Sequence, residues 1–159
     1  MWSRTCLIIA ALLFNHTVVA DSDTTISIRY LSPELTQQIV ATAVSTCTEK
    51  GYRVSAAMVN RDGTLAAFLR NPLSGPHTEE VAQRKAFSSA TFQTTTEQMQ
   101  DRQEIRHASR ILLVKGGVPI EIGGHFYGAV AVSGATEDDD AVCANAGIDV
   151  IREQLEFAE

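Results

Sequence analysis

The stretch Lys115–Ala135, KGGVPIEIGGHFYGAVAVSGA, decides how this chain is expected to fold. It holds two short apolar runs, residues 120–122 and 126–133, on either side of a glycine pair at 123–124. Adjacent glycines readily take the positive φ angles that a two-residue hairpin turn requires. We therefore predict an antiparallel hairpin, with Pro119 at a strand start or on an edge strand, where the missing N–H is tolerated.

A second hairpin is predicted earlier in the chain. Two strand-like runs, residues 53–60 and 64–70, are joined by residues 61–63, a turn in which the final glycine can take a positive φ angle. The alternation of isoleucine with polar residues over 24–29 predicts one further short strand. Because hairpins pair their strands antiparallel, we expect an α+β domain with one mixed or antiparallel sheet.

Helices are predicted between these strands. Ser32 supplies an oxygen for an N-cap and Pro33 stands where no N–H is needed, so a helix begins here and runs to Gly51. Residues 71–77 hold two prolines and a glycine and are expected to form a loop, whereas the charged segment 101–109 is ambiguous. Further helical stretches are predicted over 78–92, 94–100 and 138–157.

Residues 1–20 have the pattern of a secretory signal peptide. One basic residue precedes the apolar run 7–14, and Val18 and Ala20 stand where signal peptidase requires small side chains. The apolar run is short for a bilayer span, which takes about 20 apolar residues, and nothing later approaches that length. We expect an exported protein, periplasmic or extracellular, with a single domain over residues 21–159.

Charge and cysteine content restrict the function further. The 159 residues carry a net charge of -6 without a basic cluster, which argues against binding to the phosphates of nucleic acid. Cys47 and Cys143 remain after the leader, and their spacing is not that of a metal site. Export permits a disulfide between them, whereas cysteine is also often buried as a small hydrophobic residue. Both alternatives stay open.

Several short motifs occur together in this chain, in the order VNRDGTLAAFLR (59–70), Ala82-x-x-Lys85-Ala86, GGVPI (116–120), YGAVAVSGA (127–135) and Asp140-x-x-Cys143-Ala144. In this order they resemble the GlcG/HbpS family. That family includes haem-binding extracellular proteins and the C-terminal domain of PduO-type proteins. The resemblance covers residues 31–151, nearly the whole expected mature chain.

The resemblance implies a fold and a function. The implied fold is similar to profilin and PAS-like domains, with about five antiparallel strands flanked by helices, and members of the family usually form homo-oligomers. The implied function is binding of haem or a related tetrapyrrole, a corrinoid included. Two alternatives stay open: an enzyme that degrades haem or transforms a small acid, and an accessory protein that docks onto a sensor or another extracytoplasmic partner.

Three histidines outside the leader are candidate iron ligands, since imidazole is a common ligand of haem iron. They are His77, His107 and His125, and no two of them have the spacing of a zinc motif. His77 stands at the junction of loop and helix, and is our candidate ligand, with the Thr78 hydroxyl as the alternative. His125 is interpreted as a turn residue, and His107 has no assigned role.

Haem also carries two propionates, which require cations. Arg70, Arg84 and Lys85 lie in sequence on either side of the loop before His77. We interpret Arg84 as an ion-pair partner of Glu79 or Glu80 on the same helix. Lys85 belongs to one of the family motifs, so it is predicted to bind the cofactor together with Arg70.

The remaining candidates are Gly116 and Gly117, which precede the second hairpin. Without a side chain, glycine lets the backbone approach a flat ligand or a neighbouring subunit closely. We include both in the predicted cofactor site and assign no catalytic residue.

Overall fold

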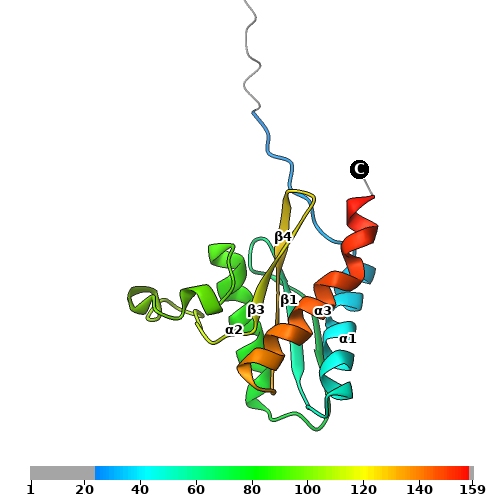
Figure 1. Ribbon diagram of the computed structural model, residues 1–159. Coiled ribbons are helices and arrows are strands. Elements are labelled where there is room, and N and C mark those ends of the chain that lie inside the picture. The colour runs from blue at the N-terminus through cyan, green and yellow to red at the C-terminus, as the bar shows by residue number, and fades with distance from the viewer. Residues whose placement is uncertain (1–23, 158–159) are drawn as a thin grey trace, which may run out of the picture.

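Both predicted hairpins are confirmed, and they form one four-stranded antiparallel sheet in the computed structural model, which describes residues 24–157 (Figure 1). The predicted signal peptide lies outside the described residues. The strand order is β2-β1-β4-β3, so the two hairpins meet where β1 pairs with β4. The strands are β1 (Ser55–Asn60), β2 (Leu65–Arg70), β3 (Gly117–Ile122) and β4 (His125–Ser133).

The predicted strand over residues 24–29 is wrong. Residues 24–30 are exposed and belong to no strand, and the side chain of Ile26 is 89% exposed. The described residues therefore form four strands where about five were expected. Alternation of apolar and polar residues gives a segment the period of a strand, but a strand also needs a neighbour with which to form hydrogen bonds.

Three helices accompany the sheet: α1 (Pro33–Glu49), α2 (His77–Phe92) and α3 (Glu137–Glu156). The predicted start of α1 is confirmed, because the Ser32 hydroxyl accepts a hydrogen bond from the N–H of Leu35. The predicted helix over 94–100 is replaced by the short 3-10 turn η1 (Glu97–Met99). A second such turn, η2 (Gln103–Ile105), lies in the ambiguous segment, and the chain around both turns projects from the body of the domain (Figure 1).

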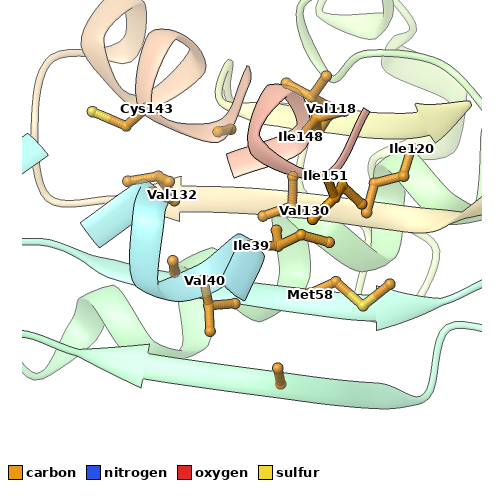
Figure 2. Close-up of a cluster of buried hydrophobic side chains, with 14 of the residues drawn as sticks. Ile39, Val40, Met58, Val118, Ile120, Val130, Val132, Cys143, Ile148 and Ile151 are labelled. Atoms are coloured by element: carbon orange, nitrogen blue, oxygen red, sulfur yellow. The ribbon is translucent and has the colours of Figure 1, made fainter. Parts of the chain in front are cut away.

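The sheet separates two apolar clusters of different character. Helices α1 and α3 cover one face, where large aliphatic side chains gather, and Figure 2 labels ten members of this cluster: Ile39, Val40, Met58, Val118, Ile120, Val130, Val132, Cys143, Ile148 and Ile151. Each fully buried isoleucine contributes roughly 1.5–3 kcal/mol to stability. Helix α2 covers the other face through alanines, and small side chains there allow the helix to lie close to the strands: Ala57, Ala82, Ala86, Ala90, Ala129 and Ala131.

The glycines of the second hairpin serve the backbone, as predicted. Gly123 and Gly124 have φ angles of +58° and +73° and close the turn between β3 and β4. Gly128 has a φ angle of +142°, and a methyl group there would lie 2.0 Å from the carbonyl oxygen of Val59. Gly128 thus allows β4 to approach β1 where an alanine would collide with its backbone.

A disulfide joins Cys47 at the end of α1 to Cys143 in α3, with the two Cα atoms 5.7 Å apart. Of the two alternatives that the sequence leaves open, the structure therefore has the bridge. Both cysteines are also fully buried in the apolar cluster between the helices and the sheet. None of the helices within residues 24–157 is long and apolar enough to cross a membrane.

Candidate functional site

The loop between β2 and α2 brings His77 and Thr78 to one end of the domain. His77 is the first residue of α2 and is exposed, whereas the side chain of Thr78 is buried. The His77 imidazole packs against Gly75: a methyl group on Gly75 would lie 2.7 Å from Cε1 and 2.8 Å from Nδ1, but 3.8 Å from Nε2. Nε2 is therefore the ring nitrogen farther from the loop.

Buried hydroxyl groups hold this loop against the sheet. The Ser55 hydroxyl on β1 lies 2.7 Å from the Thr78 hydroxyl and 3.4 Å from that of Ser74. The Thr78 hydroxyl also donates to the Gly75 carbonyl oxygen at 2.7 Å. Since buried hydroxyls are costly unless they are hydrogen-bonded, this network fixes the backbone that carries His77.

Arg70 closes the same loop from its other end. Its Nε donates to the Ser74 hydroxyl at 3.1 Å, and its Nη2 donates to the Ser74 carbonyl oxygen at 2.7 Å. The arginine remains exposed and no carboxylate pairs with it among the described residues. The structure thus brings three predicted site residues, Arg70, His77 and Thr78, to a single loop.

Lys85 lies elsewhere, in the interior. Its side chain is 1% exposed, and Nζ donates to Oδ2 of Asp140 at 2.8 Å and to the carbonyl oxygen of Lys115 at 2.9 Å. Asp140 in turn accepts from the N–H of Ala135 at 3.1 Å through Oδ1. This ion pair joins α2, the start of β3 and the first turn of α3, so Lys85 already has its anion within the chain.

Gly116 and Gly117 make room for this ion pair. A methyl group on Gly116 would lie 2.6 Å from Nζ of Lys85, and one on Gly117 would lie 2.6 Å from the Lys85 carbonyl oxygen. The group that approaches the two glycines is therefore α2 of the same chain. Their assignment to a cofactor site, like that of Lys85, stays a prediction.

Burial sets the ionisation of the pair. Removal from water lowers the pKa of Lys85 and raises the pKa of Asp140, and the attraction between the two charges opposes both changes. The short contact and the second hydrogen bond on each partner favour the charged pair, and loss of either partner would leave a buried charge uncompensated.

The other candidates are spread over the surface. The interpretation of Arg84 is confirmed, because its Nη1 lies 3.3 Å from Oε1 of Glu80. His125 opens β4 directly after the glycine turn, and His107 is exposed beyond η2. Within residues 24–157 no cluster of three histidine, cysteine or acidic side chains is arranged to hold a metal, and no pocket is enclosed.

Sequence reasoning missed the partner of Lys85 and the serines that hold the loop between β2 and α2. Asp140 belongs to one of the family motifs, but its pairing with Lys85 spans 55 residues and leaves no local signal. Ser55 and Ser74 were likewise missed, because the sequence alone does not distinguish a buried serine from an exposed one.

The fold and the loop define an α+β domain with a four-stranded antiparallel sheet, two helices on one face and one on the other. Residues 31–149 match the model of the family described as haem degrading protein HbpS-like. The chain belongs to this HbpS-like family, which confirms the resemblance found in the sequence. No curated protein matches the chain significantly.

Solved structures agree with this assignment. A crystal structure of HbpS is 28% identical with a TM-score of 0.77, and the match covers 84% of this chain and 99% of HbpS. A double mutant of HbpS from Streptomyces reticuli is 25% identical with the same TM-score, covering 93% and 99% of the two chains. A PduOC–heme complex shares the fold at 22% identity and a TM-score of 0.72, covering 77% and 96%.

Proposed function

We propose that this protein binds haem or a related tetrapyrrole. The observation that carries the proposal is membership of the HbpS-like family, together with an exposed histidine on a loop that buried hydroxyls hold in place. We further propose that the mature protein is an exported homo-oligomer formed from residues 21–159, with a profilin-like fold.

The loop between β2 and α2 offers the groups that an iron porphyrin requires, an imidazole for the iron and a guanidinium for a propionate. His77 would ligate the iron through Nε2, since Nδ1 faces Gly75. Arg70 would bind a propionate, because its two hydrogen bonds to Ser74 hold the guanidinium near the loop and further N–H groups remain for an anion. Bound haem supplies iron as the centre for ligand exchange or redox chemistry, whereas the chain positions and orients it.

Titration of the mature protein with hemin tests the proposal. We expect a saturable shift of the Soret band, and His77→Ala is expected to change the spectrum of the bound haem more than His125→Ala. His125 is the matched control because it is likewise the first residue of an element, and its side chain is partly accessible. Equal effects of the two variants would move the iron ligand away from His77, and no saturable shift would contradict haem binding itself.

The description of the family favours a second candidate, haem degradation. Incubation of the haem complex with a reductant or with peroxide distinguishes the two functions. A degrading enzyme would lose the Soret band with turnover of excess hemin, whereas a binding protein would keep it. Light scattering of the mature chain tests assembly, for which we expect at least twice the mass of the monomer.

A further inference from the structure

Two phenylalanines meet the turn between β1 and β2 on the face of the sheet that α2 covers. The guanidinium carbon of Arg61 lies 5.8 Å from the ring centroid of Phe126, at the start of β4. The ring of Phe87, on α2, packs against Gly63, where a methyl group would lie only 2.7 Å from Cε2. The turn at 61–63 therefore touches both rings and connects them into one row.

A second arginine extends this row. The guanidinium carbon of Arg110 lies 3.9 Å from the ring centroid of Phe87, within the range of a cation–π contact. Arg110 also has a φ angle of +67°, which is unfavourable for a residue with a side chain and costs on the order of 1–2 kcal/mol. Strained backbone of this kind occurs preferentially at functional sites.

These two arginines combine a contact with an aromatic ring and the lack of a carboxylate partner among the described residues. Arg84, Arg102 and Arg152 each pair with a carboxylate, whereas neither Arg61 nor Arg110 does so within the described residues. The chain has a net charge of -6, so it has an excess of carboxylates available for such pairs. Two exposed arginines over aromatic rings, without an acidic partner among the described residues, therefore form a surface that favours an anion.

The row also presents apolar surface. Phe87 and Phe126 are both partly exposed, and Arg61 and Arg110 are exposed. A guanidinium stacked on a ring keeps its N–H groups in its own plane, where they are directed sideways and can donate to a carboxylate. An anion bound there would lie directly beside the exposed parts of the two phenyl rings.

The geometry points to a binding surface for a planar aromatic carboxylate, formed by Arg61, Phe87, Arg110 and Phe126 around the turn at 61–63. The carboxylates of the ligand pair with the two guanidinium groups, and its ring system lies against the phenyl rings. This surface is separate from the His77 loop, since Phe87 follows His77 by ten residues, roughly 15 Å along a helix. It needs no metal, because it offers only cations and aromatic rings.

Metal-free protoporphyrin IX is the probe, because it is a planar aromatic dicarboxylate without iron for His77 to ligate. Its binding to the mature protein is followed by fluorescence. We expect the double variant Arg61→Gln/Arg110→Asn to weaken binding at least about tenfold, since hydrogen bonds to charged groups are among the stronger ones. Asparagine is chosen at 110 because it tolerates a positive φ angle, so this change removes the charge without adding strain.

One control variant and one further variant at the surface test whether binding is specific to it. Arg53→Gln removes an exposed arginine that precedes β1, at the opposite end of that strand from the turn, and is expected to leave the affinity for the probe unchanged. Phe126→Leu keeps an apolar side chain against the alanine cluster but removes the ring, and is expected to weaken binding. Circular dichroism of each variant verifies that the fold is retained.

The outcomes distinguish this inference from the proposed function. Loss of protoporphyrin binding in the double variant, with binding kept in Arg53→Gln, supports the surface. If protoporphyrin does not bind, or binds equally to the double variant, the inference is wrong even where hemin still shifts its Soret band. If hemin also fails to bind, the proposed function fails as well.

Discussion

Replacement of Lys85 by methionine tests the buried ion pair between α2 and α3. The Lys85 and Asp140 side chains are 1% and 5% exposed, and Nζ lies 2.8 Å from Oδ2. Methionine fills much of the same volume without a charge, so the main change is an aspartate left buried without its cation. Removal of one partner from a buried pair destabilises a protein by about 3–5 kcal/mol.

The pH dependence of the variant follows from the same contact. Burial already raises the pKa of Asp140 in the folded protein, and loss of Lys85 removes the attraction that opposes this rise. A carboxyl group with a raised pKa binds more protons when folded than when unfolded, so stability falls as the pH rises above its unfolded value of about 3.9. The deficit of Lys85→Met should therefore be smallest near pH 4 and grow toward neutral pH.

Urea denaturation of the oxidised protein measures these differences. The double variant Lys85→Met/Asp140→Leu is expected to regain most of the lost stability, because buried pairs replaced by apolar residues are often neutral. Lys115→Met is the matched control: this lysine pairs with Glu97 and Asp138 at a more accessible position and is expected to cost about 1 kcal/mol or less. Additive effects of Lys85→Met and Asp140→Leu, with no dependence on pH, would refute the reasoning.

Two further predictions concern neighbouring contacts. Replacement of Cys47 and Cys143 by alanine should lower stability by about 4–5 kcal/mol in the chain-entropy model, since the bridge spans 96 residues; two free thiols in the denatured, unreduced mature protein would contradict the bridge. Asp139 has a pKa lowered to about 2, chiefly by its hydrogen bond with Lys50. The contribution of Asp139 to stability is present above about pH 4 and is lost as the pH falls toward 2. In Asp139→Asn the free energy of unfolding should therefore depend less on pH in that window. An unchanged pH dependence would show that Asp139 is not involved.

Much of the fold could be predicted from local patterns. The glycine pair at 123–124 and the turn at 61–63 each fix a hairpin by the φ angles they require, and Ser32 fixes the start of α1 by its hydrogen bond. The prediction of a strand over 24–29 was wrong because a strand needs a neighbouring strand to pair with, and the local sequence does not specify one. The order of the strands, with β1 beside β4, is likewise a long-range result.

The candidate site was predictable only where its residues are close in sequence. Arg70, His77 and Thr78 lie within nine positions, and one loop brings them together. Gly116 was singled out for its missing side chain, but the structure was needed to show that Lys85 occupies the space. A glycine in the sequence can indicate that another group packs closely against the backbone, but it does not identify that group.

Lys85 shows that a lysine in a family motif can have a partner inside the domain, which the motif alone does not reveal. It follows Thr78 by seven residues, about two helical turns, so both side chains lie on the side of α2 that faces the sheet. A polar residue on that side needs an internal partner, and Asp140 provides it for Lys85 as Ser55 does for Thr78. Exposed residues of the same helix need no such internal partner, because water can satisfy their polar groups. We therefore expect ligand contacts to come from His77 and Phe87, which are accessible, and the two buried residues to act through the position that they give to α2.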